Sequence, residues 1–173
     1  METLSDPLGR TIDYLRISVT DRCNFRCLYC MPLAGCPSKP REEILSYDEI
    51  FQISQVMTGL GIRRIRITGG EPLVRRDLAS LIGKLSALPG IEELSLSTNG
   101  TLLGKQALVL KQAGLTRVNI SLDSLEAQTF RQITRGGNWQ AAWAGIWTAL
   151  EVGLEPVKIN VVLLKEMNDD EIL

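Results

Sequence analysis

Residues 23–30 read CNFRCLYC, so three cysteines lie within eight positions, directly after a strand-like apolar run at 14–20. Cys23, Cys27 and Cys30 offer three thiolates in a C-x3-C-x2-C spacing. A closed four-iron cluster normally takes four thiolates, and three leave one iron free to bind a ligand that reacts. The loop therefore predicts an open iron–sulfur site at the end of a strand.

Three other uses of the cysteines stay open. Cys36 could complete a structural zinc site, but such sites usually pair cysteines from two distant segments, and this chain contains no histidine. Cys36-Pro37 could instead close a ferredoxin-like cluster, although the gap of five residues after Cys30 departs from that pattern. A disulfide framework is less favoured, because the chain starts with polar residues and shows no apolar signal stretch.

Composition and charge set broad bounds on the class of protein. At 173 residues with 45% hydrophobic content, the chain is expected to form one globular domain with a buried core. A net charge of −1 gives no indication of nucleic-acid binding, and no run of about 18 apolar residues suggests a membrane span. Cysteines without a signal stretch indicate a reducing compartment, so we expect a cytoplasmic protein.

Strand-like apolar runs alternate with helical patterns along the chain. Strands are expected at 13–20, 63–68, 92–98, 117–122 and 156–164. Helices are expected from a capping box at Ser46 to about Gly59, and at about 76–87, 103–113 and 139–152. A further helix is expected to begin at Asn168 or Asp169. This βαβα repetition predicts a parallel sheet with right-handed crossovers.

Apolar and polar side chains alternate within each expected strand, whereas strands of a parallel sheet are normally apolar on both faces. Polar residues occupy alternate positions at 16–20, 64–68, 95–99, 119–123 and 158–160. A half-exposed sheet with helices on one side only would give this pattern. A curved sheet whose concave face holds a polar ligand would give it too. The face carries the cations Arg16, Arg64, Arg66 and Lys158 against the single acid Asp123, which favours an anionic ligand.

Three further motifs follow the expected strands: TGGEP at 68–72, STNG at 97–100 and SLDS at 121–124. In a barrel of parallel strands the carboxyl ends lie on one rim, where barrel enzymes bind their substrates. The cysteine loop followed by GGEP resembles the cluster-binding and methionine-binding motifs of the radical S-adenosylmethionine (SAM) superfamily. With all four segments in this order, the chain resembles the molybdenum cofactor biosynthesis protein A family, the GTP 3′,8-cyclases, from about Leu8 to Leu173.

The resemblance implies roles for individual positions. Those that would hold a [4Fe–4S] cluster are Cys23, Cys27 and Cys30. Those that match contacts to SAM are Tyr29, Gly70 and Ser121. Those that match contacts to GTP are Arg16, Arg66, Ser97 and Lys158, and at Ser97 the family pattern carries threonine. The alternative for the cations is ordinary surface salt bridges, Arg66 with Glu92 or Glu93 and Lys158 with Glu155.

The resemblance also implies an α/β fold, an incomplete TIM-like (βα) barrel of the radical SAM type with about five parallel strands visible. Residues 1–173 would form a radical SAM core domain truncated at its C-terminal end, because an eight-unit barrel takes roughly 200 or more residues. The implied activity converts GTP to a 3′,8-cyclised nucleotide through a 5′-deoxyadenosyl radical, with SAM and an electron donor as further partners. The protein could form a homodimer.

Two alternative functions stay open beside this one. The first is a radical SAM enzyme with another substrate, and the second is a non-enzymatic module in which all four cysteines bind a metal. We expect this piece of 173 residues to bind iron when isolated but not to turn GTP over.

Overall fold

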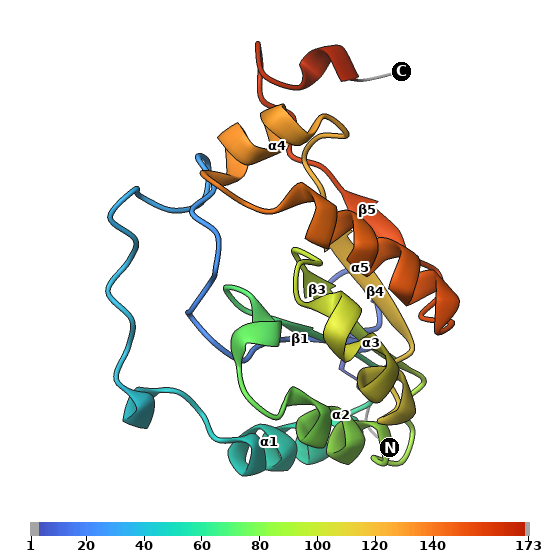
Figure 1. Cartoon of the computed structure of the whole chain (residues 1–173). Coiled ribbons are helices and arrows are strands. Elements are labelled where there is room, and N and C mark those ends of the chain that lie inside the picture. Colours follow the sequence, from blue (N-terminus) through green and yellow to red (C-terminus); the bar gives the residue numbers. More distant parts are fainter. Residues whose placement is uncertain (1–3, 172–173) are drawn as a thin grey trace.

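Five parallel strands form one sheet in the order β1-β2-β3-β4-β5 (Figure 1). The structure is a computed structural model and describes residues 4–171. The strands are β1 (Tyr14–Ser18), β2 (Arg64–Thr68), β3 (Glu93–Thr98), β4 (Arg117–Ser121) and β5 (Lys158–Asn160). The predicted parallel sheet is thereby confirmed.

Helices connect these strands and confirm the predicted alternation. They are α1 (Tyr47–Gly59), α2 (Leu78–Ser86), α3 (Leu103–Gln112), α4 (Ala127–Thr134) and α5 (Trp139–Glu151), with short 3-10 helices at Arg41–Glu43, Pro72–Val74 and Asp169–Glu171. The predicted capping box opens α1, because Ser46 Oγ accepts from the Glu49 N–H and the Glu49 carboxylate accepts from the Ser46 N–H. In the described range, none of these helices has the length and apolarity needed to cross a membrane.

One face of the sheet carries the helices and the other does not. Sequential strand order with right-handed crossovers places every connecting helix on the same side. Figure 1 shows α1, α2, α3 and α5 beside one another along that side. The strand side chains beneath them are fully or almost fully buried: Ile65, Ile67, Leu94, Leu96, Val118 and Ile120. Within the described residues, this arrangement is that of an open, incomplete TIM-like barrel.

The last part of the sheet departs from the prediction. A strand was expected at 156–164, but β5 covers only Lys158–Asn160. Beyond it, the N–H groups of Val162 and Leu164 donate to the side chains of Asp123 and Asn168 instead of to a neighbouring strand. Asn168 is buried, and the helix predicted to begin at Asn168 or Asp169 is a 3-10 turn, Asp169–Glu171, as far as the described residues reach.

Helix α4 was not predicted. It has eight residues, its N-cap residue makes no side-chain hydrogen bond, and its first turn contains no acidic residue. Its start therefore lacks the side-chain cap and the first-turn acids that mark α1.

The turn after β2 packs directly on the segment after β1. The N–H of Gly70 donates to Thr20 O at 2.7 Å, and the N–H of Glu71 donates to Arg22 O at 2.8 Å. A Cβ on Gly69 would lie 2.5 Å from Thr20 O, and one on Gly70 would lie 2.4 Å from Arg22 O. In the sequence, these glycines belong to the GGEP segment that resembles a methionine-binding motif. In the structure, the backbone next to the cysteines fills the space that the missing side chains leave.

We expect Gly70→Ala to destabilise the intact protein by about 1–3 kcal/mol, the usual cost of overpacking a tight contact. Its methyl group would overlap the backbone oxygen of Arg22, which cannot move without displacing the cysteine loop. Thermal unfolding, followed by circular dichroism, measures the change.

The matched control is Gly59→Ala at the end of α1, where an added Cβ meets nothing within 4 Å. Alanine is favoured over glycine in a helix by roughly 0.5–1 kcal/mol, so this variant should melt at the same temperature or higher. Equal melting temperatures for Gly70→Ala and the unchanged protein would contradict the packing argument.

Candidate functional site

The cysteine loop is fixed to the C-terminal end of α4. Its backbone N–H groups at Arg26 and Leu28 donate to Thr134 O at 3.3 Å and to Ile133 O at 2.9 Å. Carbonyl groups in the last turn of a helix have no partner within the helix, so they are available for such contacts. The first and the fourth βα units are thereby joined at the carboxyl ends of their strands.

Two arginine side chains brace this loop. Arg135 has the left-handed backbone conformation, with φ of 54°, and its guanidinium donates to Met31 O at 2.8 Å and Arg26 O at 3.3 Å. Arg26 Nη1 donates to the carbonyl oxygens of Cys23 and Phe25, each at 2.8 Å. The carbonyl groups at both ends of the cysteine loop are therefore held by positive charge.

All four cysteines are free thiols. Cys23 and Cys27 are half-buried, whereas Cys30 and Cys36 are exposed. Burial raises the pKa of Cys27 to about 11, and the charges of Asp123, Cys23 and Cys30 add to the effect. Burial also raises the pKa of Cys23, and the charges of Glu71 and Cys30 add to it. The three predicted ligands thus lie close enough to influence one another, together with the carboxylates of Glu71 and Asp123.

The three predicted ligands are not grouped around a single point. Within residues 4–171, no three Cys, His, Asp or Glu side chains are grouped closely enough to hold one metal ion. In a [4Fe–4S] cluster each thiolate binds a different iron, so a set of separated thiols suits a cluster better than a single ion. Because metal coordination needs thiolates, cluster binding would have to overcome the raised pKa values of Cys23 and Cys27.

Asp123 follows the end of β4 after one intervening residue, Leu122, and connects the cysteine loop to the sheet. Its carboxylate is buried, accepts from the Tyr29 hydroxyl at 2.8 Å, and accepts from the Val162 N–H at 3.0 Å. Burial, together with this hydrogen bond, raises the pKa of Tyr29 above its usual range. The predicted SAM position Tyr29 is thus held beside the end of β4, on which the predicted SAM position Ser121 lies.

A second buried carboxylate joins the ends of β2 and β3. Glu71, in the GGEP motif, is 1% exposed and accepts from Thr98 Oγ1 and the Asn99 N–H, each at 2.7 Å, and from the Leu73 N–H at 3.0 Å. Burial raises the pKa of Glu71, although the three hydrogen bonds act in the opposite direction.

The face opposite the helices, here called the polar face, carries the predicted substrate positions. Its strand residues are Arg16, Arg64, Arg66, Glu93, Ser95, Ser97, Arg117, Asn119, Ser121, Lys158 and Asn160. Arg16 and Arg66 are register partners on β1 and β2, and Ser97 and Lys158 flank Asn119 on β3 and β5. The register therefore places the four predicted GTP positions in two neighbouring groups, Arg16 with Arg66 and Ser97 with Lys158.

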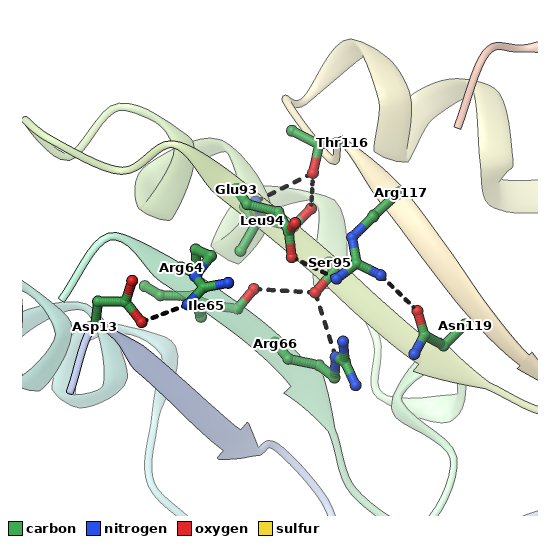
Figure 2. A network of polar contacts seen from close by, with 10 residues as sticks. All are labelled: Asp13, Arg64, Ile65, Arg66, Glu93, Leu94, Ser95, Thr116, Arg117 and Asn119. Atoms are coloured by element: carbon green, nitrogen blue, oxygen red, sulfur yellow. Dashed lines mark hydrogen bonds and ion pairs between the residues drawn. The ribbon is translucent and has the colours of Figure 1, made fainter. Parts of the chain in front are cut away.

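The cations of this face fall into two classes. Arg64 pairs with Asp13, and Arg117 pairs with Glu93 at 2.7 Å (Figure 2). Arg16, Arg66 and Lys158 form no ion pair with any residue in the range 4–171. The alternative salt bridges of Arg66 with Glu92 or Glu93, and of Lys158 with Glu155, are thus not formed within that range. Arg66 instead lies 5.4 Å from the Tyr14 ring and 3.4 Å from Ser95 Oγ.

Sequence reasoning missed the pair Glu93–Arg117 as part of this face. Glu93 has the same strand parity as Ser95, and Arg117 has the same parity as Asn119, so the alternation contained the signal. Asp123 is therefore not the single acid near the polar face. The uncompensated positive charge is carried by Arg16, Arg66 and Lys158.

Comparison with known proteins agrees with this fold and motif order. The family model described as "Radical SAM superfamily" matches residues 17–173. The chain is 55% identical to the GTP 3′,8-cyclase of Moorella thermoacetica, over 98% of this chain and 53% of that protein. It is 56% identical to the GTP 3′,8-cyclase of Listeria monocytogenes, over 99% of this chain and 52% of that protein. The chain thus spans about half the length of the curated relatives it matches.

Solved structures share the fold at low sequence identity. Streptococcus suis SuiB, bound to the precursor peptide SuiA, matches with a TM-score of 0.76 and 22% identity, over 92% of this chain and 35% of SuiB. HydG, a maturase of the [FeFe]-hydrogenase, matches with a TM-score of 0.69 and 15% identity, over 86% of this chain and 34% of HydG. With the family model covering nearly all of its length, the chain belongs to the radical SAM superfamily.

Proposed function

We propose that the intact protein is a GTP 3′,8-cyclase, a lyase that makes the first intermediate of molybdenum cofactor biosynthesis. The observation that carries the proposal is the set of uncompensated cations on the polar face, Arg16, Arg66 and Lys158, in a sheet whose carboxyl ends bear the three-thiol loop. Positive charge without a carboxylate partner suits a triphosphate. The relatives named GTP 3′,8-cyclase support the same substrate.

In this proposal Cys23, Cys27 and Cys30 hold a [4Fe–4S] cluster. Three soft sulfur donors suit iron and leave one iron open for SAM. When bound, the cluster and SAM supply a 5′-deoxyadenosyl radical that can remove a hydrogen atom from the ribose of GTP. The protein itself orients the reactants and excludes water.

SAM would lie between the cysteine loop and the ends of the strands. Tyr29, Gly70 and Ser121 are its proposed contacts. Support comes from the hydrogen bond of Tyr29 to Asp123, which fixes the loop beside β4, the strand that carries Ser121.

GTP would bind over the polar face. Arg16, Arg66 and Lys158 would contact its phosphates, and the Ser97 hydroxyl would donate or accept one hydrogen bond. Arg64 and Arg117 are excluded as primary anion ligands, because each already has a carboxylate partner.

The proposal extends to the assembly around this chain. Residues 1–173 would form the radical SAM core domain of a longer protein, truncated at its C-terminal end. An external electron donor is needed to reduce the cluster. A homodimer is also part of the proposal. The free thiols favour the cytoplasm.

The intact protein, incubated anaerobically with GTP, SAM and dithionite, should form 5′-deoxyadenosine and a 3′,8-cyclised nucleotide together. Chromatography of the quenched reaction measures both products. Formation of 5′-deoxyadenosine while GTP stays unchanged would favour a radical SAM enzyme with another substrate.

Replacing Arg16, Arg66 or Lys158 by Ala should each raise the Kd for GTP by about 10-fold or more in the intact protein. A hydrogen bond to a charged group contributes about 1.5–3 kcal/mol, which corresponds to that change. Anaerobic calorimetric titration with GTP measures it. Lys84→Ala is the control, because it removes the same charge from an exposed pair with Asp48 on the helical side. An unaltered Kd in all three variants would exclude GTP binding at the polar face.

Cys36→Ala should leave about four irons per reconstituted chain, because Cys36 is exposed and lies outside the C-x3-C-x2-C spacing of the three predicted ligands. Cys27→Ala, which has the same change of side chain, should lose most of the iron. Metal analysis and the visible absorption spectrum measure both variants. Loss of metal from Cys36→Ala would support the four-cysteine metal module instead. So would one zinc ion per chain whose binding does not change when SAM is added.

A further inference from the structure

Asn119 occupies the middle of the polar face. Ser97 on β3 and Lys158 on β5 stand in register with it, so the three side chains form one row across neighbouring strands about 4.8 Å apart. Both flanking residues are proposed contacts for GTP. A nucleotide that touches Ser97 and Lys158 must therefore pass over Asn119.

The side-chain amide of Asn119 has a fixed orientation. Arg117 Nη1 lies 2.9 Å from Asn119 Oδ1. A guanidinium group has hydrogen-bond donors only, so the amide atom that faces it must be the oxygen. The NH2 group of Asn119 consequently points away from Arg117, as Figure 2 shows.

Glu93 in turn fixes Arg117. Arg117 Nη2 donates to Glu93 Oε1 at 2.7 Å, and only 12% of the Arg117 side chain is exposed. The hydrogen bond from Arg117 lowers the pKa of Glu93, so the pair stays ionised at neutral pH. The planar guanidinium thus uses two nitrogens in a fixed fork on two partners, whereas an ammonium group has a single nitrogen for both.

The NH2 group of Asn119 is left available to a ligand. Among the described residues, its side chain hydrogen-bonds only to Arg117. Every fully buried side-chain nitrogen or oxygen in residues 4–171 has a partner, so this unpartnered NH2 group must contact solvent. Asn119 is only 4% exposed, so most of the residue is buried and its NH2 group contributes to the small area that solvent reaches.

We propose that Asn119 is a further substrate-binding residue, whose NH2 group donates to an anionic oxygen of the nucleotide between Ser97 and Lys158. Arg117 and Glu93 are positioning residues that hold the amide in the donating orientation. This inference rests on the proposed function, because it takes the ligand of the polar face to be GTP.

The test is anaerobic titration of the intact protein with GTP and, separately, with SAM. Asn119→Ala should raise the Kd for GTP by about 10-fold or more, the effect of one lost hydrogen bond to a charged group. Asn119→Asp keeps the size of the side chain and the acceptor for Arg117, yet replaces the donor by a negative charge. It should weaken GTP binding further than Asn119→Ala does. Neither variant should alter the Kd for SAM.

A purely structural role predicts a different result for Asn119→Ala. An aspartate at this position would pair with Arg117, so Asn119→Asp should keep the melting temperature or raise it. Its charge would weaken GTP binding whether or not Asn119 contacts the nucleotide, so Asn119→Ala is the deciding variant. A folded Asn119→Ala protein that binds GTP like the unchanged protein would overturn the inference. Asp48→Asn on α1 is the control. It also exchanges an acid and an amide, but on the helical side of the sheet.

The positioning role is tested by a double-mutant cycle. Arg117→Lys should raise the Kd for GTP, because one ammonium nitrogen on a flexible chain must replace the two fixed guanidinium nitrogens that bind Glu93 and Asn119. In the Asn119→Ala background the same change should have no further effect, since there is no amide left to orient. An equal effect of Arg117→Lys in both backgrounds would show that Arg117 acts on GTP independently of Asn119.

The variant Lys158→Ala distinguishes failure of this inference from failure of the proposed function. Weaker GTP binding by Lys158→Ala with unaltered binding by both Asn119 variants would refute the role of Asn119 alone. Unaltered GTP binding by Lys158→Ala, Arg16→Ala and Arg66→Ala would refute the proposed function itself.

Discussion

The buried carboxylate of Asp123 holds together the parts of the candidate site. It accepts from the hydroxyl of Tyr29 in the cysteine loop and from the N–H of Val162 beyond β5, while its own residue follows β4. A buried charge is tolerated only when hydrogen bonds replace its hydration. Its partners are therefore constrained to their places, and the loop, β4 and β5 keep a fixed relation at the carboxyl ends of the strands.

Two buried carboxylates and two arginines surround the cysteine loop. Glu71 and Asp123 lie at the strand ends, receive hydrogen bonds from uncharged donors and, in addition to burial, raise the pKa values of Cys23 and Cys27. Arg26 and Arg135 donate to carbonyl groups of the same loop. The cations without a carboxylate partner, Arg16, Arg66 and Lys158, lie on the polar face, which therefore favours anions. One sheet thus offers adjoining sites for a metal cluster and for a phosphorylated substrate.

Local patterns made much of this arrangement predictable. The alternation at Arg64 to Thr68 identified the polar face, and the Ser46 capping box identified the start of α1, because both depend on nearby residues in the sequence. The pair Glu93–Arg117 depends on strand register, which no local pattern fixes. The tight contact of Gly70 with Arg22 likewise joins segments that are distant in sequence. The roles of the individual site residues came from the resemblance to a known family and stay predictions.

The attachment of the cysteine loop to α4 affects the order in which the chain can fold. The Arg135 side chain hydrogen-bonds to the backbone of Arg26, 109 residues earlier in the sequence, and of Met31, 104 residues earlier. During synthesis the cysteines leave the ribosome long before the helix that fixes them, since domains are made from the N-terminus at about 5–20 residues per second. For several seconds, the thiols of a new chain are therefore exposed to oxidants and to competing metals. Iron that is delivered before the fourth βα unit has folded would bind to a cysteine loop that α4 and Arg135 do not yet hold in place.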